Sequence, residues 1–185
     1  TPQIAACYGN LGLVYWATGN QSLALQHHFR ALELRKAHFG ETHPIVAASY
    51  NDIGLAYSTT DKEEALDYYE KALGIYEKGL GKNHEKTANT YINIGIMYEQ
   101  MEFYGSAIAE LEKALEIERY LHPEDYPKTA FVLSSLGRVY EATGNLSSAM
   151  EYQNYALTIY KSSYGDAHPE IANTYNLIGN LYLKQ

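Results

Sequence analysis

AACYGNLGLVY, at residues 5–15, is the first of five copies of one phrase. The others are AASYNDIGLAY at 47–57, ANTYINIGIMY at 88–98, AFVLSSLGRVY at 130–140 and ANTYNLIGNLY at 172–182. Successive copies lie 42, 41, 42 and 42 residues apart. A fixed period of this length predicts an array of repeated units, each too small to bury its apolar face alone.

A glycine and a tyrosine three residues after it hold the same places in every copy. Gly inside a helix costs about 0.5–1 kcal/mol relative to Ala, so its recurrence indicates that a second helix approaches closely there. The tyrosine column also explains part of an excess of 19 tyrosines among 185 residues. The two columns are Gly12, Gly54, Gly95, Gly137 and Gly179, and Tyr15, Tyr57, Tyr98, Tyr140 and Tyr182.

A second helix follows each of the first four copies. It carries two alanines seven residues apart, which is two turns on one helical face, as at Ala24 and Ala31. Turn signals such as TGNQ and GETHP separate the helices. We therefore predict a single array over residues 1–185, cut from a longer protein, with repeats 2–43, 44–84, 85–126 and 127–168 and a final helix at 169–185. In the third repeat His122-Pro123 arrives early, so its second helix is predicted to end one turn short.

Composition narrows the class of function. The net charge of -8 opposes binding to nucleic acid, which requires clustered Lys and Arg to neutralise phosphates. The single cysteine, Cys7, allows no internal disulfide, and no run of residues is apolar enough for a membrane span. We expect a cytoplasmic protein that binds neither nucleic acid nor membrane.

The glycine, tyrosine and alanine columns resemble those of the tetratricopeptide repeat, in the 42-residue form found in kinesin light chains and many scaffold proteins. The resemblance covers the whole chain. It implies an all-α fold, a right-handed superhelical α-solenoid of antiparallel helix pairs. It also implies that a peptide or protein segment binds in a concave groove lined by the first helix of each repeat.

Carrying the groove positions of the family onto this chain gives a candidate peptide-binding set. Its members are mostly amides and apolar side chains: Asn10, Leu13, Trp16, Asn51, Asp52, Leu55, Asn89, Asn93, Ile96, Phe131, Arg138, Asn173, Asn176 and Asn180.

Asparagines dominate this set. A carboxamide both donates and accepts hydrogen bonds, so Asn10, Asn51, Asn93 and Asn176 could together clamp a peptide main chain. The alternative is that these amides bridge neighbouring helices or face water, as most polar side chains do. The residues alone favour neither interpretation.

Three further groove residues have competing interpretations. Trp16 and Phe131 could anchor a partner, but an aromatic residue at helical spacing is more commonly core, which is our expectation for both. Arg138 is expected to pair with Glu141, three residues along the helix. The positions that supply cations in the chaperone-carboxylate clamp hold neither Lys nor Arg here, which argues against that ligand.

Catalysis and metal binding are not expected. His43, His84 and His168 recur at the junctions between repeats, which is typical of a turn signature, and His27 and His28 point about 100° apart on a helix. There is no phosphate-binding glycine loop, so we expect no cofactor. The leading hypothesis is a protein-interaction scaffold; the alternatives are a regulatory or sensor arm of a larger enzyme or signalling protein, and head-to-tail self-association through the ends of the array.

Overall fold

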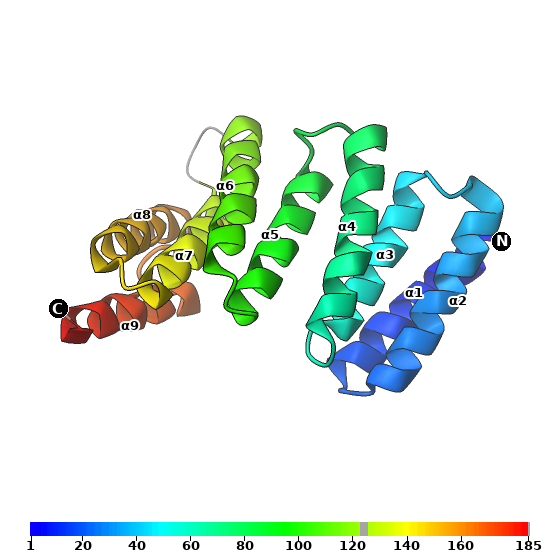
Figure 1. Cartoon of the computed structure of the whole chain (residues 1–185), viewed down its shortest axis with the longest axis horizontal. Helices are drawn as coiled ribbons and strands as arrows, with labels where there is room; N and C mark the ends of the chain where they lie inside the picture. The colour runs from blue at the N-terminus through cyan, green and yellow to red at the C-terminus, as the bar shows by residue number, and fades with distance from the viewer. Residues whose placement is uncertain (123–125, 185) are drawn as a thin grey trace. The chain divides into compact units, whose positions relative to one another are not determined.

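A computed structural model describes residues 1–122 and 126–184, and these form nine α-helices without a strand. The helices are α1 (Pro2–Ala17), α2 (Gln21–Phe39), α3 (Pro44–Tyr57), α4 (Lys62–Gly79), α5 (Glu85–Gln100), α6 (Tyr104–Leu121), α7 (Pro127–Ala142), α8 (Leu146–Tyr164) and α9 (Pro169–Lys184) (Figure 1). They belong to two compact units, residues 1–97 and 98–185.

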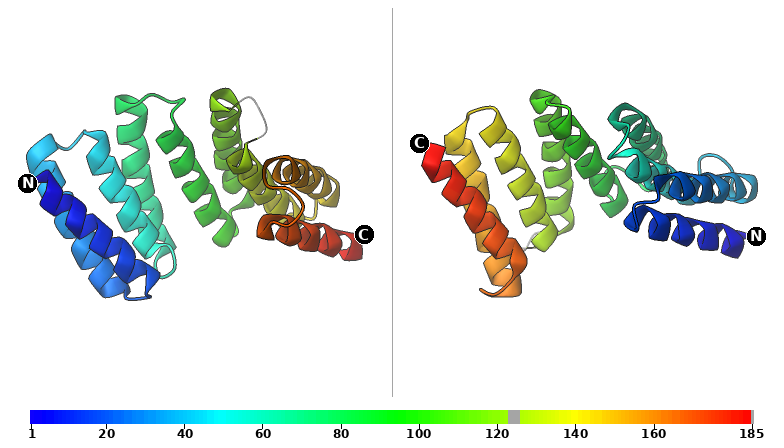
Figure 2. Two further views of the ribbon diagram at one scale, coloured as in Figure 1. Left: turned by 180° about the vertical axis from the view of Figure 1, so that it is seen from behind. Right: turned by 90° about the horizontal axis from the view of Figure 1, so that it is seen from below.

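Each unit is built from antiparallel helix pairs joined by short turns. In the first unit α2 and α4 lie in front of α1 and α3 in Figure 1, and the view from behind in Figure 2 reverses that order. First and second helices therefore form two layers. In the second unit α7 packs against α6, α8 and α9.

Every first helix begins at the residue predicted from the sequence. At three of them, α3, α5 and α9, the junction histidine caps the start of the helix. The imidazole Nδ1 atoms of His43, His84 and His168 accept hydrogen bonds from the backbone N–H groups two residues later, at 3.1, 3.0 and 3.3 Å. These bonds satisfy N–H groups that have no partner within the helix. The recurring histidine is thus a local cap, as its repetition indicated.

Three glycines of the column are points of close contact between the two helices of a pair. A methyl group added at Gly12 would lie 2.5 Å from the His28 ring, and one at Gly54 would lie 2.8 Å from the Tyr69 ring. In the second unit a methyl group at Gly137 would lie 2.5 Å from Gln153. Each contacting side chain stands four residues after the first alanine of its second helix.

Three tyrosines of the column stack on the same second helices, one residue earlier. Tyr15 lies parallel to the His27 ring at 5.1 Å, and Tyr57 to the Tyr68 ring at 5.8 Å. In the second unit Tyr140 stacks on another tyrosine, Tyr152, at 5.3 Å. Glycine and tyrosine together fix the register of the pairs α1–α2, α3–α4 and α7–α8.

A separate buried stripe on α3 packs against the preceding helix pair, and one on α7 packs against the preceding helix, α6. In α3 the stripe is Val46, Ser49, Ile53 and Ala56, of which none is more than 1% exposed. In α7 its apolar members are Val132, Leu136 and Val139, all fully buried. The core of each unit therefore runs through both faces of these helices.

The predicted early end of the second helix in the third repeat is wrong. That helix, α6, has 18 residues, the same as α4, and continues to Leu121. Proline disfavours the helical conformation only in the residue before it, so the helix extends up to the residue before His122. Residues 123–125, next to this end of the helix in the sequence, lie outside the described residues.

His28 is a buried histidine in the contact between α1 and α2. Its side chain is 1% exposed and neither ring nitrogen has a hydrogen-bond partner among the described residues. Burial, with smaller contributions from the charges of Arg35 and His27, lowers the pKa of His28 from 6.5 to about 4. This imidazole therefore stays neutral in the folded chain over the physiological range.

Two Gly→Ala substitutions should change the stability of the chain in opposite directions. Gly54→Ala would force its methyl group against the buried Tyr69 ring and, at 3.1 Å, the Ala65 carbonyl oxygen, so we expect the free energy of unfolding to fall by about 1–3 kcal/mol. Gly74 lies inside α4, with no atom within 4 Å of the added carbon, so Gly74→Ala should instead raise the free energy of unfolding by about 0.5–1 kcal/mol. Urea unfolding monitored by circular dichroism measures both. Equal stability of the two variants would contradict the packing role of Gly54.

Acid sensitivity should follow from His28. Its pKa of about 4 when folded is below its unfolded value of 6.5, so unfolded chains bind the proton more readily and stability is lost as the pH falls between these values. His28→Gln, the residue that Gln153 provides at this position in the fourth repeat, should remove on the order of 2 kcal/mol of the stability lost between pH 7 and pH 5.

Urea midpoints at pH 7 and pH 5 test this expectation for the wild type and the variant. Other titrating groups contribute to both proteins, so the difference between their pH profiles isolates His28. Parallel profiles would show that His28 is not the source of the acid sensitivity.

Candidate functional site

Three of the candidate groove residues meet at one pocket in the first unit. Asn51 and Asp52 project from α3 and Asn89 from α5, and together with Ala48, Tyr76, Lys86 and Thr90 they line a cavity of about 150 Å³. Each of the three is partly exposed. The pocket presents amide, carboxylate and ammonium groups in a space large enough for one small polar group.

Two of the candidate asparagines bridge neighbouring first helices. The Asn93 amide nitrogen donates to the Asn51 amide oxygen at 3.0 Å, which links α5 to α3. This is the helix-bridging alternative considered from the sequence. The bond uses one donor and one acceptor, so each amide retains hydrogen-bonding capacity.

Asp52 is the acidic group of this pocket. Burial raises the pKa of its carboxyl to about 6, although Arg35 and Lys86 both act in the opposite direction. Its ion pair with Arg35 is long, with 4.0 Å between carboxylate oxygen and guanidinium nitrogen, because that nitrogen donates to the Ser49 hydroxyl at 2.7 Å. The Asp52 carboxylate therefore has unused capacity to accept hydrogen bonds.

The expectation that Trp16 is a core residue is wrong. Its side chain is 36% exposed and lines a cavity of about 530 Å³ together with Ala17, Gly19, Gln21, Ala56, Thr59 and Thr60. Helical spacing alone misassigned it, because Trp16 lies one position beyond the tyrosine column, off the face that packs on α2. Leu13, in the same helix, is 38% exposed, and Leu55 and Ile96 are partly exposed.

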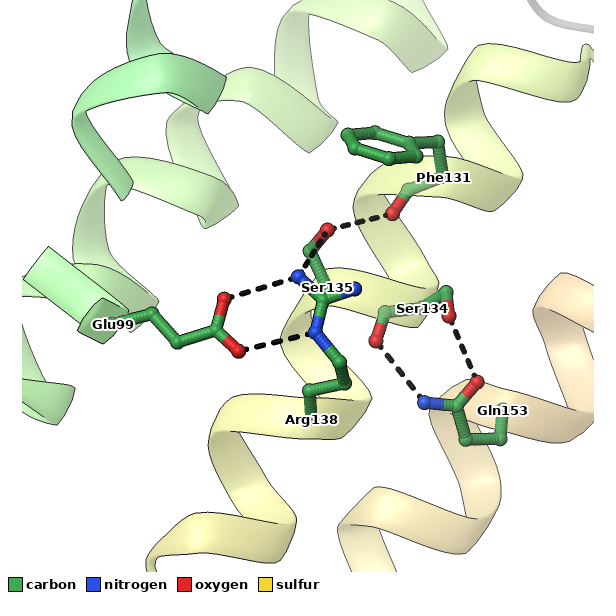
Figure 3. Close-up of polar contacts among 6 residues, drawn as sticks. All are labelled: Glu99, Phe131, Ser134, Ser135, Arg138 and Gln153. Atoms are coloured by element: carbon green, nitrogen blue, oxygen red, sulfur yellow. Dashed lines mark hydrogen bonds and ion pairs between the residues drawn. The ribbon is translucent and has the colours of Figure 1, made fainter. Parts of the chain in front are cut away.

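Arg138 does not pair with Glu141, contrary to expectation. Its guanidinium group forms two hydrogen bonds with the Glu99 carboxylate, from Nε at 3.1 Å and from Nη2 at 3.0 Å (Figure 3). Glu141 instead accepts a hydrogen bond from Lys184 of α9 at 2.6 Å. Each of these pairs joins two neighbouring first helices, which a pattern within one helix does not reveal.

The same expectation of a core role is wrong for Phe131, whose ring is 40% exposed. Figure 3 shows it on α7, on the same helix as Arg138. It lines a cavity of about 450 Å³ with Tyr126, Pro127, Lys128, Tyr160, Tyr164 and Glu170. The other members of this pocket escaped the sequence analysis because they come from the segments around α7, α8 and α9 and share no motif.

The remaining candidates, Asn10, Asn173, Asn176 and Asn180, are all exposed. Asn10 lies on α1 and the other three on α9. None of these four is in a pocket described above, so their part in binding stays a prediction.

The described residues contain no group of three His, Cys, Asp or Glu side chains placed to hold a metal ion. Among the helices that the structure describes, none combines the length and apolar character needed to cross a membrane.

Comparison with known proteins agrees with this architecture. The sequence model of the tetratricopeptide repeat matches residues 3–78, 63–119 and 86–162. No curated protein sequence matches the chain.

Similar solved structures include BtubC (BKLC) from P. vanneervenii, with a TM-score of 0.88 and 21% identity, over 98% of this chain and 73% of the other. A candidate kinesin light chain of Podosopora anserina with nearly identical TPR-like repeats gives 0.83 and 19%, over 99% and 87%. A point variant of that second protein gives 0.84 and 19%, over 98% and 86%. At these identities the likeness concerns the fold.

Proposed function

The chain belongs to the tetratricopeptide repeat family, and from this we propose that it is a scaffold that holds a peptide or protein segment against the first helices of its repeats. The observation that carries this proposal is the pocket of the first unit, where Asn51, Asp52 and Asn89 converge from two first helices. Proteins built from this repeat generally act in protein-protein interaction.

The chemistry of that pocket suits an extended main chain. A peptide presents alternating N–H donors and C=O acceptors, and carboxamides can meet both kinds of group. Asn89 has no side-chain bond to another described residue, and Asn51 keeps its amide N–H groups after accepting from Asn93. These amides would hold a peptide with little demand on its side chains.

The charge arrangement favours a protein partner over nucleic acid. Three basic side chains near the first helices are already paired with carboxylates: Arg35 with Asp52, Arg138 with Glu99 and Lys184 with Glu141. A net charge of -8 adds repulsion toward phosphates. We also propose that the chain performs no catalysis, takes no cofactor and works in the cytoplasm.

Selection of peptides from a random display library against the immobilised chain tests the scaffold function. For a selected peptide, Asn89→Ala should weaken binding about 5- to 10-fold, because a buried main-chain group of the peptide loses its partner. Asn89 is preferable to Asn93, whose replacement would also break the bond to Asn51. Fluorescence anisotropy of the labelled peptide gives the affinities.

Asn154→Ala is the matched control, since Asn154 is an exposed asparagine on the second helix α8. It should leave the affinity unchanged. If Asn89→Ala binds as tightly as the control, or if no peptide is selected, the groove of the first unit is not the binding site.

Self-association is a second candidate, favoured by one exposed stripe on α1. Ile4, Leu11 and Val14 are 50%, 43% and 58% exposed. Their counterparts in α3, which pack against the preceding helix pair, are Val46, Ile53 and Ala56, none above 1% exposed. Because α1 carries no charged side chain, a second copy of the chain could cover this stripe as a helix pair covers that of α3.

Self-association predicts a mass that rises with protein concentration in size-exclusion chromatography with light scattering. Leu11→Lys combined with Val14→Lys should return the chain to a monomer, because burying two charges in the contact is unfavourable. Tyr155→Lys, at a side chain 56% exposed on α8, is the control and should leave the mass unchanged. A wild-type chain that stays monomeric at high concentration would exclude this function.

A further inference from the structure

Exposed aromatic side chains of the second unit gather at one cavity. Tyr126, Phe131 and Tyr164 are 38%, 40% and 45% exposed, and all three line the cavity of about 450 Å³ at the start of α7. A fourth aromatic, Tyr160, is 3% exposed and stacks on Tyr164 with 6.1 Å between ring centres. A cavity of this size is in the range of ligand pockets, and aromatic walls are typical of them.

Neighbouring imidazoles hold two of these rings in place. Tyr126 stacks on His122 with 4.0 Å between ring centres, and Tyr164 stacks on His168 at 3.9 Å. His168 is itself fixed by its hydrogen bond to the backbone N–H of Glu170. The aromatic walls are therefore partly ordered without a ligand.

The two charged groups at the cavity are not equivalent. The Lys128 ammonium lies 3.2 Å from a carboxylate oxygen of Glu118, which is fully buried, so its charge is offset from within the protein. Glu170 has no ion pair with any residue that the structure describes. The uncompensated charge at the cavity is consequently negative.

Glu170 also lies close enough to the rings to act on them electrostatically. The pKa of the Tyr160 hydroxyl is raised mainly by burial, and the next contribution comes from the Glu170 carboxylate. A cation placed among these rings would thus interact with the carboxylate as well as with the negative faces of the aromatic side chains.

We propose that this aromatic cavity, formed by Tyr126, Phe131, Tyr160 and Tyr164 with Glu170 at its edge, binds an arginine side chain of a partner protein. A guanidinium group is planar, weakly hydrated and always charged, so it can stack on a tyrosine or phenylalanine ring while donating hydrogen bonds to a carboxylate. The proposal rests on the scaffold function above and assigns a side-chain preference to the second unit.

The test uses single blocked amino acids, so that it depends on the cavity alone. N-acetyl-arginine methylamide is titrated into the isotopically labelled full chain, and backbone amide shifts are followed by nuclear magnetic resonance. We expect saturable shifts confined to the residues around the cavity. The neutral isostere N-acetyl-citrulline methylamide should bind about fivefold more weakly, since it lacks the cation.

Two variants and two controls locate the interaction. Phe131→Ala and Glu170→Gln should each weaken arginine binding about fivefold. Tyr155→Ala and Glu151→Gln change an exposed ring and an exposed carboxylate elsewhere on α8 and should leave it unchanged. Thermal unfolding by circular dichroism establishes that all four variants are folded.

Several outcomes would overturn the proposal. Equal binding of arginine and citrulline would mean that charge plays no part, and tighter binding of the corresponding glutamate compound would assign the cavity to Lys128. An absence of shifts with every probe would also refute it. If a library peptide still binds through Asn89 in that case, the scaffold function stands and only the arginine cavity fails.

Discussion

In the pairs α1–α2, α3–α4 and α7–α8, the backbone of the first helix approaches the second helix so closely at its glycine that no methyl group fits between them. At Gly54 the obstacle is the ring of Tyr69 and at Gly12 the ring of His28. This contact fixes the rotation of these three first helices about their own axes, because only one face can present the glycine to its partner. The helical period then determines which residues of that helix form the buried stripe, which tyrosine stacks on the second helix and which side chains stay accessible.

With the rotation fixed, sequence differences between repeats are expressed at the accessible positions. The contact itself tolerates variation, since His28, Tyr69 and Gln153 fill equivalent places. One accessible column of the first helices varies more in chemistry, from Leu13, Leu55 and Ile96 to Arg138 and Asn180. A repeated scaffold with a variable face is suited to recognition, and it explains why membership of the family does not identify a partner.

Several polar groups on these faces bond to neighbouring helices. Asn51 bonds to Asn93, and Glu99 holds Arg138 through two hydrogen bonds. Such cross-helix bonds keep side chains in defined orientations, which lowers the entropy lost on binding. Asn89 in the first unit and Glu170 in the second lack such partners among the described residues and also line a pocket, so these are the groups to which we assign ligand contacts.

The sequence by itself determined the helix pairs, the start of every first helix and the family, because a repeated pattern of glycine, tyrosine and alanine reports local periodicity directly. It also identified the junction histidines as local features. Only the tertiary structure decided that Trp16 and Phe131 are accessible, that Arg138 pairs with Glu99, and that residues from three helices form the aromatic cavity. These features depend on which side chains of different helices meet, and spacing within one helix carries no information about that.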